Sequence, residues 1–164
     1  MDFEKRLEDA IARGQRRGSR EVQEAQQQAL SEEELRRMHS QFRLELSEYI
    51  ERGLKKLPDY FPGFRFETVA GDRGWGAAVS RDNVTRESVG RGRQSGSLFS
   101  RLEMTIRPFS AAHVLELTAK GTISNKEVYN RTHFQRLWEA HPATFCEMID
   151  LWILEYAEQY AAKS

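Results

Sequence analysis

An arginine-rich stretch near the middle of the chain has the residue types that bind anions. Its guanidinium groups alternate with glycine and serine, and its members are Arg81, Arg86, Arg91, Arg93 and Arg101. Guanidinium forks and free backbone amides can together hold phosphate oxygens, which would make this loop a site for nucleic acid or another polyanion. Against this, the 25 basic and 25 acidic residues cancel, whereas a dedicated nucleic-acid-binding protein is usually basic. The simpler interpretation is a solvated hairpin tip.

Two glutamates could perform acid–base chemistry if they lie side by side. Glu103 and Glu116 are expected on the same outward face of a sheet, and paired carboxylates with displaced pKa values can catalyse. Arg101, Arg107 and Lys120 share that face, so cross-strand ion pairs account for all five residues without a reaction. We therefore favour a protein without catalytic activity and assign no catalytic residue.

Metal and cofactor signatures are weak. The four histidines, His39, His113, His133 and His141, show no HExxH spacing, although His133 and His141 could meet Glu139 if the chain turns there. Residues 90–96 are one residue too long for a dinucleotide-binding loop and lack the strand and helix it requires. Cys146 lies among apolar neighbours, which is typical of inert packing. We expect neither a metal nor a cofactor.

The elements that position these residues follow from two periodicities. Apolar residues recur every three or four positions from Leu35 to Leu57, which predicts a helix. Alternation then predicts strands over 64–79, as a hairpin around Gly71–Gly74, and over 98–106 and 114–122. The predicted fold is α+β: an antiparallel sheet of four to five strands, with N-terminal helices and a C-terminal helical pair packed on one face.

The boundaries after residue 122 are harder to assign. Residues 124–127 match a capping box, yet Val128 and Tyr129 could extend a strand, so 125–130 is either strand or helix. A short helix is expected over 132–139, and a last helix from Pro142 to about Ala162. Because Leu151, Ile153 and Leu154 add apolar groups outside the main stripe, the middle of the last helix should be covered nearly all round.

The chain is expected to contain an N-terminal helical arm, residues 1–30, and one α+β domain, residues 31–164. Gly14 and Gly18 weaken the arm as an isolated helix, so its thin apolar stripe should pack on something else. The predicted protein-contacting residues on the arm and the last helix are Phe3, Leu7, Ile11, Leu151 and Leu154.

Composition supports a non-membrane protein. Apolar residues make up 39% of the chain and charged residues 30%, and no run approaches the roughly 20 apolar residues of a spanning helix. A single cysteine and the lack of a signal-peptide pattern predict a cytoplasmic location. The order of elements is similar to that of several small adaptor and secretion-chaperone folds. We predict a non-catalytic protein-interaction, adaptor or chaperone-like protein whose partner is another protein or a second copy of itself.

Overall fold

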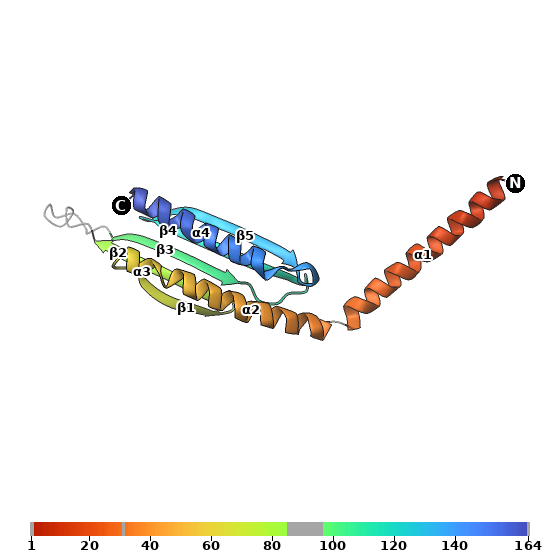
Figure 1. Ribbon diagram of the computed structural model, residues 1–164, viewed down its shortest axis with the longest axis horizontal. Coiled ribbons are helices and arrows are strands. Elements are labelled where there is room, and N and C mark those ends of the chain that lie inside the picture. The colour runs from red at the N-terminus through yellow and green to blue at the C-terminus, as the bar shows by residue number, and fades with distance from the viewer. Residues whose placement is uncertain (1, 31, 85–96, 164) are drawn as a thin grey trace. The chain divides into compact units, whose positions relative to one another are not determined.

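The computed structural model describes the backbone of residues 2–30, 32–84 and 97–163, and the chain forms two compact units, residues 1–37 and 38–164. The first unit contains α1, Asp2–Leu30, and the start of α2, Glu32–Leu54, which continues into the second unit (Figure 1). The remaining elements are α3 (Leu57–Tyr60), β1 (Arg65–Gly71), β2 (Gly74–Val84), β3 (Ser97–Ile106), β4 (Val114–Ile123), β5 (Lys126–Arg136), the 3₁₀ turn η2 (Leu137–Glu139) and α4 (Pro142–Lys163).

The second unit is built on a five-stranded antiparallel sheet with strand order β1-β2-β3-β4-β5. Each strand pairs with the next along the chain, as sequential strands commonly do. The predicted first hairpin is confirmed: a two-residue turn joins Gly71 to Gly74, whose φ angles are 145° and 127°. Glycine adopts these angles without steric cost. The predicted α+β fold with an antiparallel sheet is therefore correct.

One face of the sheet forms the core, and β3 shows the alternation most clearly. Leu102, Met104 and Ile106 are fully buried, as their spacing predicts. Cross-strand partners share a face, so the register continues the buried face across all five strands. One such row runs through Phe66, Val79, Leu102, Gly121 and Tyr129.

Helices α2 and α4 cover this buried face (Figure 1). Leu46, Ile50 and Leu54 of α2 are fully buried, which confirms the predicted stripe. α4 packs on β4 and β5 through a stripe that includes Phe145 and Ile149, both also fully buried. The opposite face of the sheet has no cover from either of these two helices.

The two helices also contact each other. The Tyr49 hydroxyl donates to both carboxylate oxygens of Asp150, at 2.9 and 2.8 Å. A Cβ at Gly53 would lie 2.8 Å from Cδ1 of Ile153, so glycine permits the close approach of α2 to α4. This contact half-buries Ile153, one of the apolar residues of α4 that lie outside its main stripe.

The segment 125–130, left open between strand and helix, consists of the last turn residue and the start of a strand. A tight turn stands where a capping box was possible. Ser124 and Asn125 have φ angles of 49° and 69°, as both central residues of a type I′ hairpin do. The turn is fixed to β3: Asn125 donates its backbone N–H to the carbonyl of Phe99 at 2.8 Å, and its side chain accepts from the Phe99 N–H at 2.9 Å. β5 starts directly after the turn.

The predicted helix over 132–139 is wrong for most of its length. β5 remains paired with β4 as far as Arg136, which lies opposite Val114, and only Leu137–Glu139 form a single 3₁₀ turn. The first member of the C-terminal helical pair is therefore this one turn, and α4 is the second. The mainly polar composition of β5 hid its two-residue alternation from the sequence analysis.

A buried histidine joins α2 to the segment after β3. His39 is 3% exposed, and its Nε2 donates to the carbonyl of Arg107 at 2.9 Å. Its ring also packs edge-on against Phe109. Burial lowers the pKa of His39; the hydrogen bond to Arg107 opposes this effect without outweighing it, and the nearby Arg43 lowers the pKa further.

We predict that acid weakens the fold through His39. Because its folded-state pKa lies below the unfolded value of about 6.5, the stabilisation from neutral His39 is complete above that pH. It is lost as the pH falls from about 6.5 toward the folded-state pKa. His39→Gln keeps a donor for Arg107 but cannot titrate, so its free energy of unfolding should depend less on pH in that range. Urea unfolding across the range tests this, and an unchanged slope in His39→Gln would contradict the prediction.

Candidate interaction surfaces

The first candidate surface is the apolar stripe of α1, which we define as Phe3, Leu7, Ile11 and Val22. These side chains are 72%, 47%, 52% and 56% exposed, and every residue from 2 to 25 is exposed. The helix is continuous through Gly14 and Gly18. The structure therefore places the three predicted contact residues of the arm together on one helix face, with Val22 extending the row.

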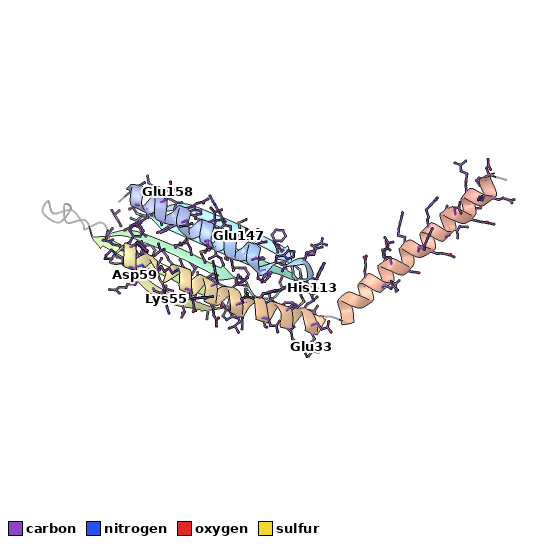
Figure 2. All side chains as sticks on the ribbon, in the orientation of Figure 1. Glu33, Lys55, Asp59, His113, Glu147 and Glu158 are labelled. Carbon is purple, nitrogen blue, oxygen red and sulfur yellow. The ribbon has the colours of Figure 1, made fainter. Side chains whose placement is uncertain are left out.

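The second candidate surface lies on the outer side of α4. Leu151 is 47% exposed and Leu154 is 67% exposed. The sequence predicts that the middle of α4 is covered nearly all round, but the described chain does not cover these two leucines. Glu147 and Glu158, labelled in Figure 2, share this side because the four residues follow one another at intervals of four, three and four. This surface is a pair of leucines with a carboxylate at each end.

The uncovered sheet face carries a charge network centred on Arg101. Its guanidinium contacts Glu67 at 2.5 Å and Glu103 at 3.1 Å, and Glu103 lies opposite Lys120 in the register. Burial opposes the charge of Arg101, but the hydrogen bonds to the two glutamates outweigh it and raise its pKa. Ala78 beneath this network is fully buried although it is on the uncovered face. Ion pairing accounts for Arg101, Glu67 and Glu103.

The two glutamates considered for acid–base chemistry are not cross-strand neighbours. Glu103 lies opposite Lys120. Glu116 is four residues before Lys120 on β4, and its carbonyl accepts from the N–H of Arg107. The hypothesis of paired carboxylates is therefore wrong for this pair. Both expected faces are correct, since Glu116 and Glu103 point away from α2 and α4.

The described arginines of the candidate anion site are on opposite faces of the sheet. Arg81 is on the helix-covered face, where Nε donates to Asn83 at 2.7 Å and a second nitrogen lies 3.4 Å from the Tyr160 hydroxyl. Arg101 is on the other face, so the structure does not bring these two together. The remaining candidates, Arg86, Arg91 and Arg93, lie outside the described residues.

Sequence analysis missed a polar cluster that joins β5 to α4. Glu155 accepts from the hydroxyl of Tyr129 and from Arg131 at 2.6 Å, and the guanidinium of Arg131 lies 4.4 Å from the Tyr129 ring centre. The hydroxyl of Tyr156 donates to the carbonyl of Thr122 at 2.8 Å, next to a register shift between Gly121 and Thr122. Tyr129, Arg131 and His133 alternate along the strand, and this alternation could have revealed the inward face. The first two are close enough in the strand to contact the same helix.

Burial controls the titration of these tyrosines. It raises the pKa of Tyr129 to about 12, and the hydrogen bond to Glu155 adds to the effect. Burial also raises the pKa of Tyr156. A Cβ at Gly121 would lie 3.0 Å from the Cβ of Tyr129 and 3.1 Å from the Tyr156 ring, so glycine makes room for both rings. Both tyrosine rings are buried between β5, β4 and α4, so the cluster helps to pack α4 on the sheet.

Two exposed aromatic residues near the end of β5 were also missed. Phe134 is 62% exposed on the uncovered sheet face, and Trp138 is 46% exposed. The guanidinium of Arg136 lies 5.7 Å from the Trp138 ring centre. The incorrect helix over 132–139 prevented their assignment to a surface.

The last candidates for chemistry are His133, the possible metal ligands and Cys146. His133 packs edge-on against Phe145, with ring centres 4.9 Å apart. Over the ranges 2–30, 32–84 and 97–163, no group of three or more His, Cys, Asp or Glu residues could hold a metal ion. Burial raises the pKa of the half-buried Cys146 thiol, and the carboxylates of Glu45 and Asp150 raise it further. A raised pKa lowers the reactive thiolate fraction.

Comparison with known proteins found no family model, no curated protein and no solved structure that matches this chain. None of the described helices combines the length and apolar character needed to cross a bilayer.

We predict that Tyr129→Phe lowers the free energy of unfolding at neutral pH. We also predict that this free energy then changes less as the pH rises into the alkaline range. Removal of the hydroxyl loses a hydrogen bond to a carboxylate, which costs about 1–2 kcal/mol. The folded-state pKa of about 12 lies above the unfolded value of about 10, so this stabilisation is present below pH 10 and is lost as the pH rises toward 12. The two proteins should therefore converge in free energy of unfolding over that range. Tyr60→Phe, at a 78% exposed site, is the control and should match wild type; a constant gap for Tyr129→Phe would contradict the prediction.

Proposed function

We propose that this chain is a non-catalytic protein-interaction module of the adaptor type, with α1 as its contact element. The observation that carries the proposal is the exposed apolar stripe of Phe3, Leu7, Ile11 and Val22 along a 29-residue helix. A helix gains most of its stability from packing an amphipathic face, and Gly14 and Gly18 reduce what this helix gains alone. A partner surface supplies the missing burial.

The second unit supports this proposal by the way its polar groups are used. Several charged residues of the sheet and α4 are paired with one another: Arg101 with Glu67 and Glu103, and Arg131 with Glu155. Every buried side-chain nitrogen or oxygen in the described part of the chain has a hydrogen-bond partner. Reactive sites usually leave such groups poised toward a ligand.

A polyanion-binding role is the alternative, and it would depend on Arg86, Arg91 and Arg93. Arg81 and Arg101 are both engaged within the chain and lie on opposite faces, so they support it less than the sequence predicts. For this reason we place protein binding first.

Photo-crosslinking from α1 tests the proposed function directly. A photoreactive phenylalanine analogue at Ile11 should form covalent adducts with protein in cells that express the full chain. The same analogue at Ala12, which points away from the stripe, is the matched control and should form few. Equal yields at both positions, or no protein adduct at Ile11, would refute α1 as the contact element.

We further predict that removal of residues 1–28 leaves the second unit folded. The buried core side chains of the described residues, from Leu35 through Leu46 and Leu102 to Phe145 and beyond, all lie after residue 28. Thermal unfolding should remain one cooperative transition with a midpoint within a few degrees of the full chain. Loss of the cooperative transition would show that the division into an arm and a folded unit is wrong.

A further inference from the structure

The stripe of α1 has a period that suits a straight helix–helix seam. Phe3, Leu7 and Ile11 are followed by Gly14, Gly18 and Val22, so the intervals are four, four, three, four and four. Eleven residues per three turns gives 3.67 residues per turn, close to that of an undistorted helix. The row therefore stays close to one side of the helix, and a second helix can face it from Phe3 to Gly18 with only a slight right-handed coil.

The two glycines in this row have no explanation within their own helix. A Cβ built at Gly14 or Gly18 would meet nothing within 4 Å, and neither glycine has the positive φ that favours this residue. Glycine lowers helix propensity, so alanine would form a better isolated helix. A close approach from outside the chain would account for both positions, because glycine leaves room for a bulky partner side chain.

Steric fit indicates which side chains of a second helix can pack against Gly14 and Gly18. When two copies of α1 lie antiparallel, with the two-fold axis between residues 10 and 11, facing positions have numbers that sum to 21. Phe3 then faces Gly18 and Leu7 faces Gly14, so each large side chain meets a position without one. In a parallel, in-register pair Phe3 faces Phe3 and the glycines face each other, which leaves a crowded end and a gap.

Charge favours the same arrangement. Residues 2–9 hold four acidic and two basic side chains, whereas residues 13–20 hold four arginines and no acid. The antiparallel pair superimposes the acidic segment of one helix on the arginine segment of the other. The parallel pair brings the four arginines of both copies to within roughly one Debye length of 8 Å, where repulsion is still strong.

We infer that α1 pairs with α1 of a second copy of this chain, antiparallel over residues 2–19, with Phe3 and Leu7 seated over Gly18 and Gly14 of the other copy. The pairing rests on the proposed function, since it needs the stripe to be a contact surface, and it names the partner. It is isologous, so it closes as a dimer and does not extend into a fibre.

Sedimentation of the full chain tests the pairing. Wild type should be dimeric at tens of micromolar, and Leu7→Glu should weaken dimerisation by at least about tenfold, because a carboxylate replaces an apolar side chain in the seam. Ala12→Glu is the matched control: it adds the same side chain to the same helix away from the stripe and should leave the dimer intact. A wild-type chain that stays monomeric at 100 μM or above overturns the inference.

A second substitution separates a fitted seam from general stickiness. Gly18→Leu improves helix propensity and enlarges the apolar stripe, so a surface that merely attracts apolar groups would associate more tightly. In the antiparallel seam the new leucine takes the place of Phe3 from the other copy. We expect weaker dimerisation, by about tenfold or more. Tighter association overturns the inference.

Spin-label distances decide the orientation. Single labels are placed at Asp2→Cys, Ala12→Cys or Ser19→Cys in a Cys146→Ala background, and electron–electron distances are measured in the full-chain dimer. Positions 2 and 19 should each give at least about 27 Å, since 17 residues rise 1.5 Å apiece along the axis and packed helix axes lie about 8–10 Å apart, and position 12 should give the shortest distance of the three. Equally short distances at positions 2 and 19 indicate a parallel pair and overturn the inference.

The crosslinking result distinguishes this inference from the proposed function. Adducts at Ile11 with a different protein, together with a monomeric chain, overturn self-pairing but leave the proposed function intact. A monomer without intermolecular adducts, in which Leu7→Glu lowers the unfolding temperature, indicates that the stripe packs within its own chain, and it overturns both.

Discussion

The burial of one sheet face beneath two helices is the constraint on which the second unit depends. Leu102, Met104 and Ile106 on the central strand are fully buried, and their alternation fixes the register of β3 with respect to both neighbours. A slip by one residue would turn these side chains to the uncovered face and bring Arg101 and Glu103 beneath the helices. The ion pairs of Arg101 with Glu67 and Glu103 are therefore consequences of the same register.

The sequence predicts an element well where its apolar residues repeat over several turns or pairs. β3 and α2 are such elements, and both are confirmed. β5 is not, because Asn130, Arg131 and Gln135 give it a polar composition on both faces and its inward side is satisfied by Glu155 of a distant helix. That pairing is a tertiary contact, and no local pattern contains it.

The candidate site was predictable to a similar degree. The exposed stripe of α1 follows from spacing alone, so Phe3, Leu7 and Ile11 could be named in advance. The faces on which Arg81 and Arg101 lie could not be predicted, since the two residues belong to different strands and their relation depends on the register between β2 and β3. Glu103 and Glu116 show the same limit: the expected face was correct, but their relative position required the register.

The order of pairing in the sheet has a consequence for how the second unit forms. Every strand pairs with its sequence neighbour, so the sheet can assemble stepwise from contacts that are local in the sequence. The contact between Tyr49 and Asp150 is different, because it joins residues 101 positions apart. Docking of α4 beside α2 therefore carries the largest loop-closure entropy in this unit, and the hairpins beneath the helices shorten that loop before it closes.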